Sequence, residues 1–219
     1  DTSVFSVTTD FEWFAGGAHG EYALTGACFD VQTGERLTAE KVFTDINKLR
    51  EVIATTLNEK YSEALTPEDI DNYLLSKTDN DFNIIVGYEG VTVVFNVYEI
   101  GPYAAGMQRI YLPFCEYSDI INPAYTSVPD SYVIPISKNE IEGISVDIGS
   151  DGTADTLSLV SITDEYDFDF FNQLELVVNG ELHYYDCYGY EVESYIVKHN
   201  GVQAIYSNVK TENDYKYLF

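Results

Sequence analysis

The sequence contains few basic residues, and this shortage excludes several classes of partner. Eleven lysines and arginines stand against 37 aspartates and glutamates, so the chain of 219 residues has a formal net charge of −26. Nucleic acids and anionic membranes are bound through cationic side chains, and we therefore predict neither as a partner. Cationic proteins, cationic wall components and divalent metals would be attracted. The alternative is that the acidity only keeps an exported protein soluble.

Cysteine and histidine are scarce as well. The three cysteines contain no CxxC pair, which argues against a disulfide framework or a cysteine-based zinc site. Small buried thiols are expected, and a single Cys28–Cys115 bridge is the alternative. The three histidines are too widely spaced for a zinc motif. No G-x-S-x-G elbow or lysine-containing phosphate loop is present. A pair of carboxylates such as glycosidases use carries little information here, because among 37 acids some pair will always look suitable. We predict no catalytic residue.

Long apolar runs are also missing. No stretch approaches the roughly 20 apolar residues of a membrane span, and no basic, apolar leader opens the sequence. If the protein is exported, we expect its signal or lipid anchor to lie outside this sequence. Any contact with a membrane would then be made only through that anchor.

The residues that are present favour sheets, because 19 tyrosines and 12 phenylalanines suit half-buried pleated surfaces. Strands are expected at residues 3–13, 21–30, 82–86, 91–95 and 107–113. Two helices lie between them, one capped by Asp45 and one opened by Thr66-Pro67. Over residues 1–121 this order predicts an α+β fold, an antiparallel sheet with two helices on one face.

The remainder of the chain has a different pattern. Residues 122–131 contain two prolines and no periodicity, and we interpret them as a linker. Residues 132–219 show no helical stripe, whereas Asn179-Gly180 and Asn200-Gly201 each lie between strand-like runs, the strongest short-range hairpin signal. We predict an all-β hairpin module. Its strand spacing is that of a sandwich or of truncated propeller-like repeats.

Two segments of the first module are candidates for binding. Gly16-Gly17-Ala18-His19-Gly20 holds three glycines in five residues, which permits positive φ angles and close approach to another surface. The loop 96–106 presents tyrosines among small residues, and tyrosine gives large contact area at low entropic cost. A tight turn and a structural crossover are the alternatives, and the residues alone favour the tight turn. The candidate ligand-binding residues are Gly17, His19, Tyr98, Glu99 and Tyr103.

These two segments resemble, in order and separation, the hallmarks of the RsiV-like family of extracellular domains. The run Ile110–Glu116 is similar to the strand that closes those domains, and the resemblance covers residues 1–121. The sequence departs from the family at Val97, where proline is frequent, and at Gly101, where alanine is frequent.

The resemblance implies a sensory or accessory role outside the membrane of a bacterium, with no catalytic residue in this domain. One family member is the extracellular part of a lysozyme-sensing anti-sigma factor, and others lie beside a peptidoglycan deacetylase domain or occur as lipoproteins. An extracellular, cell-surface location follows from the resemblance. Lysozyme, another cationic protein or a cell-wall glycan is the implied ligand.

A third motif, Asp147 to Asp155, predicts a metal site. Carboxylates at Asp147, Asp151 and Asp155, with glycine at the sixth position, give a calcium ion several oxygen ligands and a tight bend. The loop resembles the calcium loops of propeller-type repeats in surface proteins, although Gly149 stands where those loops carry Asp or Asn. An Asp-Gly hairpin turn with solvated acids is an equally good interpretation.

Three hypotheses for the function follow. The first is a non-enzymatic binding or sensing protein of the cell envelope, with calcium as the cofactor that the 147–155 loop would hold. The second is an accessory domain of a peptidoglycan-modifying enzyme, and the third is a structural or adhesive surface protein. The first hypothesis predicts saturable binding without turnover, the second predicts turnover of wall fragments, and the third predicts neither.

Overall fold

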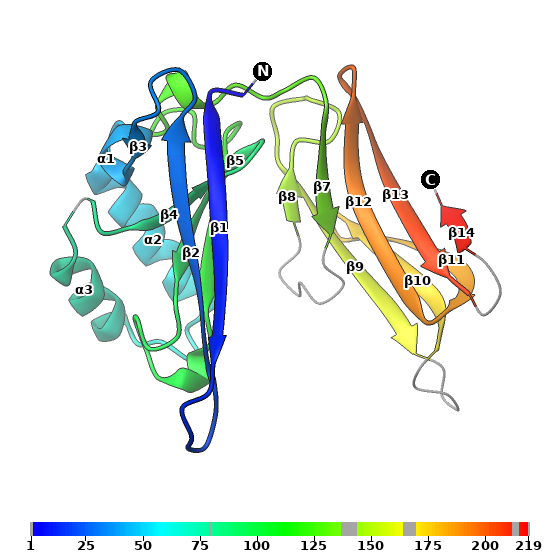
Figure 1. The fold of residues 1–219 in the computed structure, drawn as a ribbon, viewed down its shortest axis with the longest axis horizontal. Helices are drawn as coiled ribbons and strands as arrows, with labels where there is room; N and C mark the ends of the chain where they lie inside the picture. The colour runs from blue at the N-terminus through cyan, green and yellow to red at the C-terminus, as the bar shows by residue number, and fades with distance from the viewer. Residues whose placement is uncertain (1, 79, 137–143, 164–169, 212–214, 219) are drawn as a thin grey trace. The chain divides into compact units, whose positions relative to one another are not determined.

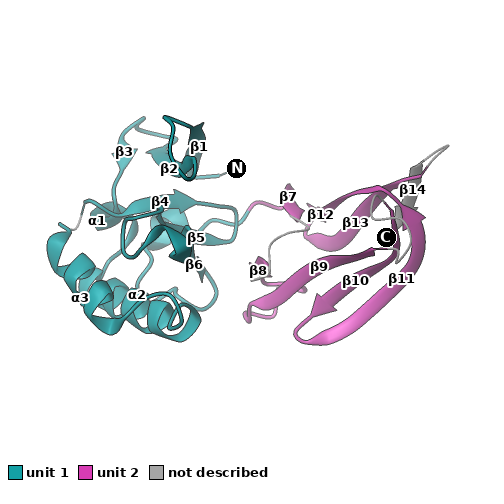
Figure 2. Cartoon of the chain, turned by 90° about the horizontal axis from the view of Figure 1, so that it is seen from below, with its two compact units in different colours: residues 1–128 teal, residues 129–219 magenta. Residues whose placement is uncertain are grey.

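The computed structural model describes residues 2–78, 80–136, 144–163, 170–211 and 215–218. The chain divides into two compact units, Asp1–Val128 and Pro129–Phe219 (Figures 1 and 2). The division falls inside the stretch 122–131. The first unit combines helices with antiparallel sheets and the second consists of strands, so the predicted α+β class with a β-rich C-terminal part is confirmed.

The strands of the first unit form two three-stranded antiparallel sheets rather than one. The first sheet has the order β1-β2-β3 and consists of Val4–Trp13, Glu21–Asp30 and Arg36–Leu37. The second has the order β4-β5-β6 and consists of Asn83–Val86, Gly90–Phe95 and Gln108–Pro113.

Side chains, not a backbone ladder, join β2 to β4. The amide group of Asn83 accepts from the N–H of Gly26 at 2.9 Å and donates to the carbonyl of Leu24 at 2.7 Å. The Cys28 thiol donates to the Ile84 carbonyl at 3.5 Å. Because these bonds replace the strand-to-strand pairs, the two sheets are separate layers, which the strand pattern in the sequence did not show.

The helices begin where the sequence places their caps. Helix α2 spans Ile46–Lys60, and the Asp45 side chain accepts from the N–H of Lys48. Helix α3 spans Pro67–Ser76, and Thr66 and Asp69 form a reciprocal capping box. A one-turn helix, α1 at Ala39–Val42, precedes them, and single 3-10 turns occur at Tyr103–Ala105 and Pro123–Tyr125. These three short elements were not predicted.

The first unit is layered around one core. The β1-β2-β3 sheet lies on one side of β4-β5-β6, and α2 and α3 cover the other side (Figure 2). Leu49, Ile53 and Leu57 of α2 are fully buried, as is Phe95 of β5. Tyr125, from the predicted linker, packs against this core, so the first unit extends past residue 121.

The second unit consists of two four-stranded antiparallel sheets. One has the order β11-β10-β9-β8, with strands at Glu181–Gly189, Phe171–Val178, Asp155–Thr163 and Ile144–Val146. The other has the order β14-β13-β12-β7, with strands at Tyr215–Leu218, Val202–Lys210, Glu191–His199 and Tyr132–Ile136.

Both sheets contribute to a single core, which makes the unit a β-sandwich. Leu157 and Leu174 from one sheet and Ile196 and Val209 from the other are each at most 1% exposed and belong to one cluster. This arrangement does not confirm the expected propeller-like repeats.

The two predicted hairpins are confirmed. Asn179-Gly180 joins β10 to β11 and Asn200-Gly201 joins β12 to β13. All four residues have positive φ, between 50° and 80°, as a type I′ turn requires.

None of the three cysteines, all of which lie in the described residues, is in a disulfide, so the alternative of a Cys28–Cys115 bridge is not borne out. Cys28 and Cys187 are buried, as expected of small packed thiols, whereas Cys115 is partly exposed. Within the described residues, none of the helices has the length and apolar character that crossing a membrane requires.

Candidate functional site

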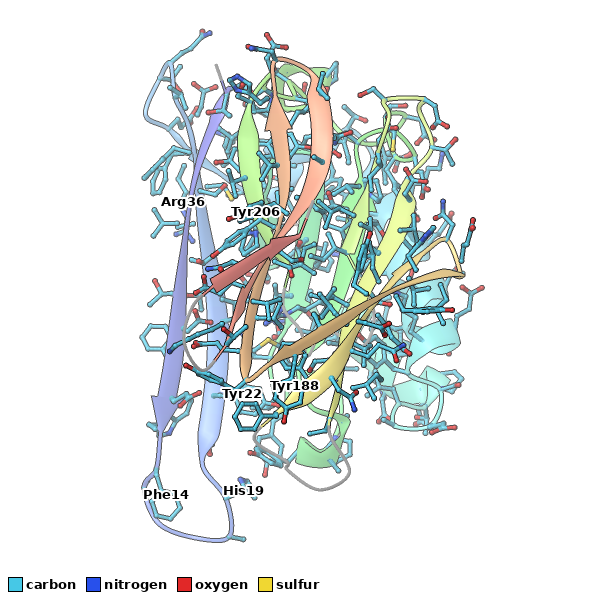
Figure 3. All side chains as sticks on the ribbon, turned by 90° about the vertical axis from the view of Figure 1, so that its right-hand side faces the viewer. Phe14, His19, Tyr22, Arg36, Tyr188 and Tyr206 are labelled. Carbon is cyan, nitrogen blue, oxygen red and sulfur yellow. The ribbon has the colours of Figure 1, made fainter. Side chains whose placement is uncertain are left out.

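The first candidate segment is the turn at the tip of the β1–β2 hairpin. Strand β1 pairs with β2 from Val4↔Asp30 to Trp13↔Glu21, and the chain reverses between these last two residues. Gly16 and Gly17 have φ of +91° and +120°, and a β-carbon added at either position would meet no atom within 4 Å beyond the adjacent residues. Figure 3 shows Phe14 and His19 on this turn. Glycine is needed here for backbone geometry and not for close packing.

The second segment, the loop 96–106, is anchored at both ends. The Asn96 side chain accepts from the N–H of Leu24 at 2.8 Å, which ties the end of β5 to β2. Gly106 ends the loop with φ of +68°. Tyr98 has φ of +65°, a conformation that costs a residue with a β-carbon about 1–2 kcal/mol.

The structure brings these two segments together. The Tyr98 hydroxyl lies 3.1 Å from Nε2 of His19, although the residues are 79 positions apart. The His19 ring stacks on the Tyr103 ring with centroids 3.7 Å apart and an interplanar angle of 17°. The Tyr103 hydroxyl donates to the carbonyl of Gly20 at 2.9 Å. We call His19, Tyr98 and Tyr103 the aromatic cluster.

The aromatic cluster is open to solvent on one side. Tyr98 is 55% exposed, His19 is exposed and Tyr103 is half-buried. The half-buried Tyr22 of β2 meets the edge of the Tyr103 ring at 6.3 Å between centroids. The cluster therefore offers aromatic faces and hydroxyl groups to a ligand, held in place from both segments.

Glu99 has other partners. One carboxylate oxygen accepts from the Tyr73 hydroxyl and from Nζ of Lys77, each at 3.1 Å, and the other accepts from the N–H of Asn96 at 2.8 Å. Burial, and then the charge of Glu99, raise the pKa of Tyr73 well above its usual value. The Glu99 side chain is 20% exposed. It fastens the loop to α3.

A cavity of about 330 Å³ lies beside the aromatic cluster. It is shared by β1, β2 and the start of β6, and it is lined by Asp10, Phe11, Glu12, Tyr22, Ala23, Gly106, Met107 and Arg109. Two carboxylates and one guanidinium meet in it. Sequence reasoning did not find this cavity, because its walls are almost 100 residues apart; only the alternation that turns Asp10, Glu12 and Tyr22 to one face hints at it.

The acids of the 147–155 loop are engaged with the chain itself. The Asp147 carboxylate accepts from the N–H groups of Asp151 and Gly152, at 2.9 and 3.0 Å. Asp151 accepts from the N–H of Thr153, and Asp155 accepts from that of Ile148 and from the Asn179 amide. Among the described residues, no group of three or more acids, histidines or cysteines is arranged to hold a metal. The calcium site stays a prediction without structural support.

Comparison with known proteins identifies a family for part of the chain. Residues 40–115 match the family described as "Protein of unknown function (DUF3298)", so this stretch carries a domain of that family. The match leaves out the 16–20 turn, and the finer RsiV-like assignment is not confirmed. No curated protein matches the chain.

Solved structures of the same family are similar to part of the chain. A DUF3298 family member from Bacteroides fragilis is 22% identical with a TM-score of 0.43, over 56% of this chain and 50% of that one. A DUF3298 family protein from Pseudomonas aeruginosa is 15% identical with a TM-score of 0.41, over 58% of this chain and 59% of that one. The chain thus spans about half to three-fifths of these proteins.

Proposed function

We propose that the chain is a non-enzymatic binding or sensing module that works outside the cytoplasmic membrane of a bacterium and contacts its ligand through the aromatic cluster. The observation that carries this proposal is the junction of two distant segments, His19 with Tyr98 and Tyr103. Taken alone, the 16–20 turn and the 96–106 loop can each be explained as purely structural, the first as a tight turn and the second as a crossover. Their meeting at an exposed point makes a preorganised surface.

The conformation of Tyr98 supports a role in binding. Its backbone holds an unfavourable φ of +65° while its ring stays 55% exposed, so little burial of the ring offsets the strain. Strained residues are concentrated at sites where function requires a fixed geometry. Tyrosine also suits a contact surface, because its ring is large and has few rotamers to lose.

The ligand that fits this surface best is a cationic protein such as lysozyme, and a cell-wall glycan that stacks on the rings is the alternative. The net charge of −26 favours the cationic protein. Asp10 and Glu12, in the cavity beside the aromatic cluster, add local acidity against the single cation Arg109.

Calorimetric titration with lysozyme at physiological salt tests the proposal. We expect saturable binding, and we expect Tyr98→Ala to weaken it by about tenfold, the effect of roughly 1.4 kcal/mol of lost contact. The matched control is Tyr184→Ala, which removes an equally exposed tyrosine (64%) from the sandwich unit.

Two results would contradict the proposal for lysozyme. Binding that disappears with modest added salt would show that lysozyme is held only by non-specific electrostatic attraction to the acidic chain. Equal binding by the Tyr98→Ala and Tyr184→Ala variants would remove the aromatic cluster from the interface. A titration with soluble wall fragments then tests the glycan, again with the same two variants.

A further inference from the structure

Strand β1 is a long strand at the edge of its sheet. In the described part of the chain it pairs with β2 alone, through ten consecutive residues. The backbone groups on its other side form a row of donors and acceptors, which natural proteins usually protect with proline, lysine or a bulge. The β1 sequence, VFSVTTDFEW, contains no proline or lysine, and its register with β2 is unbroken.

One face of this strand carries an apolar stripe. Phe5, Val7, Phe11 and Trp13 are 59%, 41%, 48% and 47% exposed. Because side chains alternate along a strand, all four point to the same side. Three of the cross-strand partners on β2 extend this surface with small or apolar side chains, namely Phe29, Ala27 and Ala23, and the fourth, opposite Trp13, is the acidic Glu21. We call the four β1 residues the β1 stripe.

The opposite face of β1 is acidic near its end. Asp10 and Glu12 are exposed there and line the cavity of about 330 Å³ together with Tyr22. A second cavity of about 350 Å³ lies at the start of β1, where Ser3 to Ser6 meet Val86, Gly87 and Tyr88. Both cavities adjoin the face of β1 that carries Ser6, Asp10 and Glu12, where Ser6 donates to the carbonyl of Val86. An added strand would therefore find room for side chains on that face and an apolar surface, the β1 stripe, on the other.

From this we infer that β1 is a docking edge for an extended segment of another protein in which basic and apolar residues alternate. The segment adds a strand to the β1-β2-β3 sheet, its apolar side chains cover the β1 stripe, and its basic side chains approach Asp10 and Glu12. Backbone pairing supplies affinity in such complexes, and the alternate side chains supply specificity.

Charge decides between this occupant and a second copy of the chain. A second copy would bring another net charge of −26 to the interface, whereas a basic segment neutralises part of it. The inference concerns a different surface from the aromatic cluster, and it stands whether or not lysozyme binds.

The chain contains its own reporter for this edge. Trp13 is the only tryptophan, and it lies in the β1 stripe at 47% exposure. The probe is a blocked peptide as long as β1 in which lysine alternates with valine, titrated into the full chain at physiological salt. We expect a saturable blue shift of the tryptophan emission as the ring leaves water.

Two control peptides separate strand pairing from charge. The same peptide with N-methyl groups on alternate peptide bonds keeps its charge but cannot donate along one edge, and it should bind at least about tenfold more weakly. A peptide with glutamate in place of lysine should not bind. Both controls leave the protein unaltered, so a folding defect cannot imitate their result.

A pair of variants locates the site. Phe11→Lys places a like charge in the β1 stripe and should weaken the lysine–valine peptide by about tenfold. Leu75→Lys, at an 86% exposed position of α3, should leave binding unchanged. Circular dichroism confirms that both variants fold.

Three outcomes would overturn the inference. The lysine–valine peptide does not shift the emission, or the N-methylated peptide binds as well as the unmodified one, or the protein alone shows a concentration-dependent shift with the mass of a dimer. The last result would assign the edge to a second copy.

Discussion

At the scale of single residues, Gly26 shows how closely the two sheets of the first unit approach. A β-carbon at this position would overlap the carbonyl oxygen of Ile84 and lie 2.7 Å from Cγ1 of Ile85. The N–H of Gly26 on β2 can donate to the Asn83 side chain only because no side chain stands between them.

Gly26→Ala should therefore destabilise the first unit. We expect its free energy of unfolding to fall by about 1–3 kcal/mol, because the added methyl group forces the sheets apart. Urea denaturation followed by circular dichroism measures the change. Thr25→Ala, at the exposed neighbouring position, is the control. Equal stability of the two variants would show that the sheets adjust without cost.

Tyr98 offers a separation of function from stability. In Tyr98→Gly, relief of the strained φ of +65° offsets the lost contact with His19 and the greater entropy of glycine. We expect the free energy of unfolding to change by less than about 1 kcal/mol while lysozyme binding is lost. Denaturation and calorimetry on the same sample test this.

Tyr103→Gly is the comparison for Tyr98→Gly. It should cost more stability, because its ring stacks on His19 and its hydroxyl bonds Gly20 without any relief of strain. The reverse order of stabilities would contradict the account of Tyr98 as a strained binding residue.

At the scale of elements, the α3 cap makes stability depend on pH. The Thr66 hydroxyl, and then the Thr66 N–H, donate to the Asp69 carboxylate and hold the pKa of Asp69 below its usual value. A carboxyl with a lowered pKa in the folded state stabilises the fold above its unfolded pKa of about 4, and this contribution is lost as the pH falls through the folded value.

Asp69→Asn tests this contribution. The variant should melt below the wild-type chain at neutral pH, and the gap should narrow as the pH falls toward about 3. Thermal melts at a series of pH values measure the gap. Asp71→Asn removes a charge from the same helix without touching the cap. A gap for Asp69→Asn that stays constant with pH would contradict the role of the ionised cap.

The 147–155 loop gives a second test at this scale. Asp147→Ala removes the acceptor of two backbone N–H groups, so the melting temperature should fall by the same amount in calcium and in chelator. If calcium raises the wild-type melting temperature and Asp151→Ala abolishes that rise, the acids bind metal after all. The two media therefore distinguish a turn from a metal site.

Signals that act over a few residues predicted the elements well. The Thr66-Pro67 cap and the Asn-Gly turns were predicted correctly because the hydrogen bonds of the cap and the φ angles of the turns are set by residues within four positions of one another. Helix α1 and strand β3 were missed, because four residues and two residues are too short to show any periodicity. The separation of the first unit into two sheets depends on Asn83, and its partners on β2 lie more than 50 positions away.

At the scale of the whole molecule, the candidate site also combines features that a short stretch of sequence predicts with contacts between distant residues that it does not. The order of the 16–20 turn and the 96–106 loop suggested that both matter, but only the fold shows that His19 meets Tyr98 and Tyr103. Glu99 was selected as an acid in a loop. Its partners Tyr73 and Lys77 come from α3 and the residue that follows it, which no local pattern reveals.

The reactivity of the cysteine thiols measures whether both hydrophobic cores are intact. Cys28 belongs to the core of the first unit and Cys187 to that of the second, and Cys115 is partly exposed. We expect one thiol to react with a chromogenic disulfide reagent in the native chain and all three to react in denaturant. Only one reactive thiol in denaturant without reductant would mean that a bridge had formed.

The two Asn-Gly turns are also sites at which the protein can deamidate slowly as it ages. Asparagine before glycine is the dipeptide most prone to deamidation, because the glycine nitrogen can attack the side-chain amide, and asparagine is counted among the thermolabile residues. At Asn179 both ends of that amide are engaged, with Asp155 and with the N–H of Thr156, whereas the Asn200 amide nitrogen lies 3.1 Å from the ring of the adjacent His199. Ageing should therefore mark the β12–β13 turn first, and each event makes an already acidic protein more acidic.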